Sequence, residues 1–285
     1  MITLGARTAG VRMRGTEETN GAQLSYRDVR DVPAYLINLE QNTDRLTAST
    51  ATLTGAGLRV TRVPAVDGRG LDLETLPDCD PQAALRLYGR PLKGGEYGCY
   101  KSHLACAERM LEEGHDIALV FEDDVTLHPA FASAVSTLLH VLERSGLDWK
   151  LVNIGAGATR LYTPLEQLTP DHLLVAAHYF PQGAFGLLWH RRGAEEFVAN
   201  HSKVCMTVDN LFRHIMIRRG GGFAVVPPLV HHEEGVSVID AGKKNSRYAK
   251  RRWNYGLLKQ RRFWVNRAIA LWKKMHYRPH DLAGR

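Results

Sequence analysis

Cysteine and long apolar runs are scarce in this sequence, and each scarcity argues against a class of protein. Four cysteines in 285 residues are too few and too scattered for the disulfide framework of a small secreted domain, so a reducing compartment fits better. No apolar run approaches the roughly 20 residues of a membrane-spanning helix, and the first residues lack the apolar stretch of a secretory signal. We therefore expect a cytoplasmic protein, peripheral at the inner face of the cell membrane.

Acidic residues are missing from one segment, residues 243–278, which holds thirteen Lys and Arg and no Asp or Glu. Subtracting these thirteen from the 37 basic residues leaves 24 against 30 acidic ones, so the rest of the chain carries about −6. Trp264, Ala268, Leu271 and Trp272 form a helical stripe among the positive charges, which favours an anionic membrane surface as partner. Nucleic acid is the less favoured partner, and packing of a basic helix on the acidic body is the alternative.

Apolar runs and helical periodicities alternate along the chain. Residues 34–39 and 58–63 are typical of strands on either side of a helix, an order that predicts a βαβ unit. Apolar residues spaced i, i+4, i+7 and i+11 predict a helix over 98–113, whereas 71–97 is expected to be irregular. The remaining predicted elements are helices at 129–144, 192–200 and 208–218 and strands at 150–154, 173–178, 184–189 and 223–226.

Together these elements predict an α/β fold with a Rossmann-like mixed sheet and flanking helices. We expect this fold over residues 32–240. A flexible leader would precede it over 1–31, and a basic, aromatic-containing tail would follow it over 241–285.

Three consecutive carboxylates, Glu122, Asp123 and Asp124, follow the apolar run 117–121. In open α/β sheets the ligand crevice lies at the carboxyl ends of such strands. Adjacent acids repel one another unless a cation neutralises them, and Mg²⁺ and Mn²⁺ are bound by carboxylates together with substrate phosphates. The triplet therefore predicts a metal–diphosphate site, and the alternative is a solvated acidic turn.

Seven segments spread over about residues 33–240 form an ordered set: Tyr35–Arg45, Arg62–Gly68, Leu92–His103, Leu119–Val125, Gly186–Ala194, Val208–Asp209 and Val226–Leu229. Taken together and in this order, they resemble glycosyltransferase family 25, the lipopolysaccharide and lipooligosaccharide galactosyltransferase group. The resemblance implies a GT-A-like transferase that uses Mn²⁺ or Mg²⁺ and a UDP-sugar. It also implies transfer of a hexose, expected to be galactose, with inversion, to a lipopolysaccharide-type glycan or glycolipid acceptor.

On this resemblance we assign roles to residues of this chain. Asp124 is the expected direct metal ligand. Of the adjacent His231 and His232, His231 is the expected further ligand by similarity to other GT-A enzymes, and here the sequence departs from the family, which often has an amide residue at this place. Asp209 is the expected catalytic base and Glu122 a second catalytic residue. The nucleotide-sugar pocket would be formed by Asn38, Asp44, Arg45, Asp67, Ser102, His103 and Asp123.

Simpler interpretations stand beside these roles. Asp209 is equally typical of the first turn of a helix, Asp44 and Arg45 of a local helix-start pair, and two loop histidines of a solvated surface. Cys99, His103, Cys106 and Met110 share one helix face, a pattern more typical of core packing than of a soft-metal site. Two further functions remain open: nucleotidyl or phosphoryl transfer at the same acidic site, and a non-catalytic relative that binds glycans or membranes.

Overall fold

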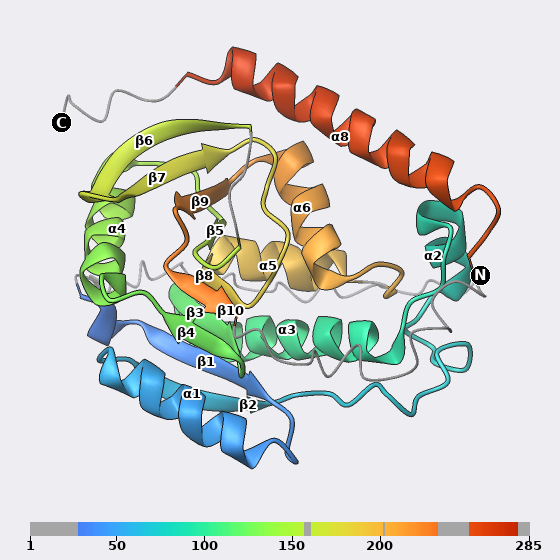
Figure 1. The fold of residues 1–285 in the computed structure, drawn as a ribbon, viewed down its shortest axis with the longest axis horizontal. Coiled ribbons are helices and arrows are strands. Elements are labelled where there is room, and N and C mark those ends of the chain that lie inside the picture. Colours follow the sequence, from blue (N-terminus) through green and yellow to red (C-terminus); the bar gives the residue numbers. More distant parts are fainter. Residues whose placement is uncertain (1–27, 157–160, 202, 233–250, 279–285) are drawn as a thin grey trace, which may run out of the picture.

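The computed structural model of the protein describes residues 28–156, 161–201, 203–232 and 251–278, and these form an α/β fold (Figure 1). The helices are η1 (Val29–Asp31), α1 (Thr43–Gly55), α2 (Pro81–Tyr88), α3 (Gly94–Glu112), α4 (Phe131–Ser145), α5 (Arg191–Asn200), α6 (Val208–Arg219) and α8 (Tyr255–His276). The strands are β1 (Pro33–Asn38), β2 (Arg59–Pro64), β3 (Ile117–Glu122), β4 (Val125–Leu127), β5 (Leu151–Asn153), β6 (Tyr162–Thr169), β7 (His172–Ala177), β8 (Gly186–His190), β9 (Gly222–Val226) and β10 (Val230–His232).

Eight strands form one mixed sheet in the order β2-β1-β3-β8-β5-β9-β7-β6. β1 lies between β2 and β3 and is parallel to both, as the predicted βαβ unit requires. β8 pairs antiparallel with β3 on one side and with β5 on the other, so the sheet is mixed at its centre. The predicted α/β class with a mixed sheet and flanking helices is therefore confirmed.

Two clusters of buried apolar side chains cover the two faces of the sheet. Strand side chains alternate between the faces, so in β1 Leu36 joins one cluster while Tyr35 and Ile37 join the other. On the Leu36 face, α4 supplies Phe131, Val135, Leu138 and Leu142. On the opposite face, α3, α5 and α6 supply Tyr100, Leu104, Phe197 and Phe212.

The predicted irregular stretch 71–97 is wrong in two places. Asp80 accepts a hydrogen bond from the backbone N–H of Ala83 and starts α2, with Pro81 at its first position. α3 begins at Gly94, because the Glu96 side chain accepts from the Lys93 backbone N–H and closes the first turn. Sequence periodicity also missed β6, in which Pro164 and a shift of register interrupt the alternation of apolar residues.

Both ends of the predicted domain can be compared with the described chain. The predicted leader lies outside the described residues except for 28–31, where Val29 is buried and its backbone N–H donates to Ser136 on α4. At the other end, β10 pairs antiparallel with β4 in a separate two-stranded sheet. β4 directly follows the acidic triplet in the sequence. This small sheet brings residues 230–232 back to the end of β3.

Candidate active site

A pocket lies at the carboxyl ends of β1, β2 and β3, where an open α/β sheet binds ligands. The acidic triplet forms one wall, the loop after β2 another, and the first turns of α3 the floor. The residues that line it are Ile37, Leu39, Asn42, Arg45, Ala65, Val66, Asp67, Gly68, Arg69, Gly95, Cys99, Ser102, His103, Glu122, Asp123, Asp124 and His232. The predicted site residues Arg45, Asp67, Ser102, His103, Glu122, Asp123 and Asp124 are all brought together here.

Asp123 is held by Asn38, which is buried at the end of β1. The Asn38 Nδ2 donates to Asp123 Oδ2 at 2.6 Å and to the Asn42 carbonyl at 3.0 Å, while its Oδ1 accepts from Arg62 Nε at 3.1 Å. Ser49 on α1 donates to the Asp123 carbonyl at 2.8 Å. Asn38 therefore acts behind the pocket wall, orienting a carboxylate that lines it, rather than lining it itself.

Asp124 lies between two cationic or proton-binding side chains. Arg45 Nη1 is 3.1 Å from Asp124 Oδ2 and 3.4 Å from Asp123 Oδ1, and His232 Nε2 is 3.2 Å from Asp124 Oδ2. Burial and the neighbouring Glu122 charge raise the pKa of Asp124, and His232 and Arg45 oppose that rise. The other oxygen, Oδ1, is buried and has no hydrogen-bond partner.

Glu122 faces α3 instead. His103, whose side chain is fully buried, places Nε2 3.3 Å from Glu122 Oε1, and the Cys99 thiol lies 3.7 Å from the same oxygen. Burial raises the pKa of Glu122, but the hydrogen bond and charge of His103 and the charge of His232 outweigh it, so the pKa lies below its ordinary value. Glu122 is therefore an ionised carboxylate in the pocket at neutral pH.

Three glycines let the loop after β2 approach α3 closely. A Cβ on Gly98 would lie 2.2 Å from the Val66 carbonyl oxygen, and one on Gly94 would lie 1.8 Å from the Gly68 carbonyl oxygen. Ser102, one turn after Gly98, accepts a hydrogen bond from the Val66 backbone N–H at 2.9 Å. Asp67 on this loop pairs with Arg69, at 2.8 Å from the Arg69 Nε, and accepts from Gln41 at 3.2 Å.

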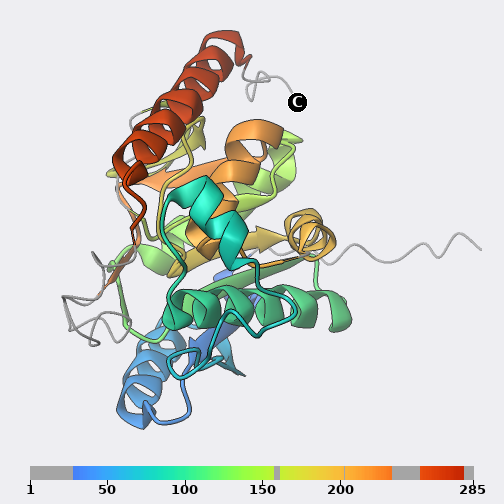
Figure 2. The same cartoon turned by 90° about the vertical axis from the view of Figure 1, so that its right-hand side faces the viewer.

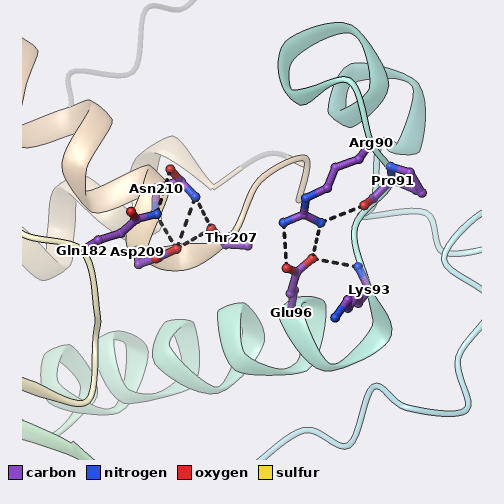
Figure 3. A network of polar contacts seen from close by, with 8 residues as sticks. All are labelled: Arg90, Pro91, Lys93, Glu96, Gln182, Thr207, Asp209 and Asn210. Atoms are coloured by element: carbon purple, nitrogen blue, oxygen red, sulfur yellow. Dashed lines mark hydrogen bonds and ion pairs between the residues drawn. The ribbon is translucent and has the colours of Figure 1, made fainter. Parts of the chain in front are cut away.

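Asp209, Asp44 and His231 do not line the pocket. Asp209 accepts hydrogen bonds from Thr207 and the Asn210 backbone at the start of α6, in a network that lies above α3 (Figure 3). Asp44 is exposed in the first turn of α1. His231 pairs with Thr126 on β4, and because side chains alternate along a strand it is His232, not His231, that faces Asp124.

The charge of Asp209 affects one side chain that lines the pocket, Cys99. Burial raises the pKa of the Cys99 thiol well above its ordinary value, and the charges of Glu122 and Asp209 raise it further. Beside Asp209 lies a second network in which Arg90 makes two hydrogen bonds of 2.8 Å to Glu96, at the first turn of α3 (Figure 3). Asp209, the predicted base, thus lies in the first turn of α6, and its hydrogen bonds go to Thr207 and Asn210 and not to the acidic triplet.

Sequence reasoning missed several lining residues, and His232 is the most informative. The His231–His232 pair was noticed, but choosing between them required the register of β10 against β4, which no local pattern supplies. Arg69 and Asn42 were overlooked because polar residues in turns carry no distinctive spacing. Arg62 does not line the pocket but donates to Asn38 behind it, and its position within β2 indicated only a strand residue.

The residues around Asp124 fit a hard divalent cation. The buried Oδ1 of Asp124 has no hydrogen-bond partner and is an available oxygen ligand, and the His232 imidazole nitrogen lies 3.2 Å from the other carboxylate oxygen, Oδ2. A second group, Cys99, His103 and Glu122, has its ligand atoms within 4.8 Å of one another in the described part of the chain. Thiolate and imidazole ligands suit softer metals, whereas the carboxylate oxygens around Asp124 suit Mg²⁺ or Mn²⁺.

Residues 31–169 match the family model of glycosyltransferase family 25, described as a lipopolysaccharide biosynthesis protein family. Procollagen galactosyltransferase 1-A of Xenopus laevis is 31% identical over 191 residues, covering 64% of this chain and 30% of that protein. The inactive glycosyltransferase 25 family member 3 of Homo sapiens is 32% identical over 130 residues, covering 42% of this chain and 21% of that protein. This chain therefore spans about a third or less of the length of these relatives.

A solved structure was also found to be similar. It is a glycosyltransferase involved in the glycosylation of the major capsid of PBCV-1, with 10% sequence identity and a TM-score of 0.38, covering 72% of this chain and 94% of that one. The match to the family model is the informative one, because residues 31–169 include β1 to β6 and therefore the acidic triplet and the glycine contacts with α3.

Proposed function

The chain belongs to glycosyltransferase family 25 over residues 31–169, and from this we propose that it transfers a hexose from a UDP-sugar to a glycan acceptor, with galactose as the expected hexose. The family description as a lipopolysaccharide biosynthesis protein supports a lipopolysaccharide-type acceptor, and the relatives named procollagen galactosyltransferase support galactose as the sugar. The single observation that carries the proposal is the meeting of the acidic triplet, Arg45 and the α3 floor in one pocket.

Arg45 is the cation placed to bind a diphosphate. Its guanidinium pairs with both Asp123 and Asp124 at the pocket wall. When a diphosphate binds, Arg45 would exchange one of these carboxylate partners for a phosphate oxygen. Asn38 keeps Asp123 oriented during that exchange, because its hydrogen bonds to Asp123 and Asn42 do not involve Arg45. Asp124 and His232 would hold a Mn²⁺ or Mg²⁺ ion, which supplies neutralisation of the charge that develops on the departing nucleotide.

Glu122 is the carboxylate placed to accept the proton of the acceptor hydroxyl in an inverting transfer. It lines the pocket, is ionised at neutral pH and is oriented by His103 on the rigid α3. His103 would hold the receiving carboxylate in place, because its buried Nε2 lies 3.3 Å from Glu122 Oε1. Asp209, outside the pocket lining, would act through the electrostatics of Cys99 and the adjoining Arg90 network.

A non-catalytic role is the second candidate, and one observation favours it. A human relative that is 32% identical carries the name inactive, so identity at this level does not distinguish active from inactive members. Such a protein would use the same pocket to bind a glycan or nucleotide without turnover. Nucleotidyl transfer at the same acidic site would differ from both by consuming nucleoside triphosphates.

The test is a panel of nucleotide-sugars with Mn²⁺ and a glycan acceptor, read out as release of UDP. We expect release from a UDP-hexose, none from nucleoside triphosphates, and loss of release by at least about a hundredfold in Asp124→Asn. Asp44→Asn is the matched control, because that carboxylate is exposed outside the pocket, and it should retain activity. UDP binding without release from any donor would favour the non-catalytic role.

Measurements of metal affinity distinguish the roles of the two adjacent histidines, His231 and His232. Calorimetry with Mn²⁺ should show about tenfold weaker binding for His232→Ala and unchanged binding for His231→Ala, since only His232 contacts Asp124. Equal effects of the two substitutions would contradict the assignment of the metal to this side of the pocket.

A further inference from the structure

Large exposed apolar side chains gather in and just before α8. They are Trp253, Leu257, Phe263, Trp264, Val265, Leu271, Trp272 and Met275. Elsewhere in the described residues only Val66, Leu71 and Leu87 belong to this class. Trp264 is 61% exposed, so its indole is not packed on the body of the protein. Figure 1 and Figure 2 both show α8 along the outer edge of the molecule.

The face of α8 that meets the body carries both cationic and apolar side chains. Arg262 donates to the Leu87 carbonyl and lies over the Tyr88 ring of α2, 4.1 Å from its centroid. Lys273 donates to the Arg218 carbonyl at the end of α6, at 2.8 Å. Apart from Ala270, no residue of the helix is buried. α8 is therefore held to the body by these polar contacts together with apolar ones, in which Tyr255 and Leu258 lie near Gly89 and the Phe263 ring lies near that of Tyr179.

The opposite, outward face is apolar as well, whereas the solvent side of a surface helix is usually polar. Leu257, Trp264 and Leu271 are spaced seven residues apart, close to two helical turns, and Met275 follows Leu271 by four residues. All four side chains are exposed and form one stripe. Arg261 and Lys274, also exposed, flank it, and the helix contains no Asp or Glu.

We propose that this outward stripe of α8 binds an anionic membrane surface. Charge complementarity selects that partner: the apolar side chains would enter the interfacial layer while the flanking cations meet lipid phosphates. Tryptophan favours the membrane–water interface, and two tryptophans, Trp264 and Trp272, lie on the exposed side. Within the described residues no helix is long and apolar enough to cross a membrane, so α8 would lie on the surface. The proposal does not depend on the proposed enzymatic activity.

Co-sedimentation of the full chain with lipid vesicles tests the apolar part of the proposal. Vesicles of phosphatidylcholine alone are compared with vesicles in which roughly a quarter of the lipid is phosphatidylglycerol. Leu271→Ser and Trp264→Ser should each weaken binding to the anionic vesicles about tenfold. Leu71→Ser is the matched control, because Leu71 is 42% exposed against 46% for Leu271 but lies in the loop after β2, and it should leave binding unchanged.

Charge substitutions test the second part. Arg261→Gln with Lys274→Gln should weaken binding to the anionic vesicles about 30-fold, and added salt should have a similar effect on the parent chain. Arg144→Gln with Lys203→Gln removes the same charge from exposed positions outside α8 and should have little effect. Circular dichroism of each variant verifies that the helix content is retained.

Three results would overturn the proposal. The parent chain would fail to bind anionic vesicles, or the α8 substitutions would leave its binding unchanged. Alternatively, light scattering would show a dimer that Leu271→Ser and Trp264→Ser dissociate, which would mean that a second copy of the chain covers the stripe.

Discussion

Replacing Gly98 with alanine tests how the pocket wall is attached to α3. The added Cβ would lie 2.2 Å from the Val66 carbonyl oxygen and 3.0 Å from the Gly68 backbone nitrogen. An ordinary carbon–oxygen contact is about 3.3 Å or longer, so the loop has to retreat by about 1 Å. Neither partner is the end of a flexible side chain, so the strain cannot be relieved by a change of rotamer.

The energetic cost follows from two contributions. Overpacking against backbone costs about 1–3 kcal/mol, and retreat of the loop stretches the hydrogen bond from the Val66 N–H to Ser102, which contributes about 1 kcal/mol more. We therefore expect the free energy of unfolding to fall by about 2–4 kcal/mol, with about 2–4 °C in Tm for each kcal/mol. Asp67 and Arg69 move with the loop, so affinity for UDP should fall as well.

Urea unfolding followed by circular dichroism measures the first effect, and calorimetry with UDP measures the second. Gly256→Ala is the matched control, because it lies in α8 with nothing within 4 Å of the added Cβ and should be neutral or slightly stabilising. The reasoning would be refuted if Gly98→Ala unfolded within about 0.5 kcal/mol of the parent chain and bound UDP equally well.

Two other perturbations give measurable outcomes. Asn38→Ala should lower the free energy of unfolding by about 2–3 kcal/mol in urea titrations and weaken UDP binding, because Arg62 and Asp123 lose a buried partner; unchanged binding would mean that Asp123 is oriented by other groups. Burial, helped by the charges of Lys274 and Lys273, lowers the pKa of His178 to about 4. The contribution of neutral His178 to the free energy of unfolding is therefore fully present above the unfolded-state pKa of 6.5 and is lost as the pH falls toward 4. Between pH 7.5 and pH 5 this loss is about 2 kcal/mol. His178→Gln should flatten that part of the pH profile, and an equally steep profile in the variant would exclude His178 as its source.

The elements with clear periodicity could be predicted from the sequence to within a few residues. The acidic end of β3 and the helix α3 are examples, because each combines an apolar pattern with a definite terminus. α2 was not found, since its eight residues are few for a periodicity and its start depends on a capping contact of Asp80. β6 was not found, because its pairing with β7 is interrupted by register shifts.

The site was predictable where neighbouring residues share one strand end and unpredictable where distant segments meet. Glu122, Asp123 and Asp124 are adjacent in sequence, so their meeting required no knowledge of the fold. The choice between His231 and His232 depended on the pairing of β10 with β4, and the placement of Asp209 depended on how α6 packs on α3. Long-range register and helix packing are properties of the folded chain that a local pattern does not contain.

The position of β8 has a consequence for any shortened form of the protein. β8 lies between β3 and β5, yet it comes from residues 186–190, beyond the segment 31–169 that matches the family. A fragment cut at residue 169 would keep the acidic triplet but lose β7, β8 and β9, which leaves β3 with an unpaired edge and β5 and β6 without their partners in the sheet. The segment that matches the family model is therefore shorter than the unit expected to fold. Expressed fragments should extend at least through β10, which also retains His232.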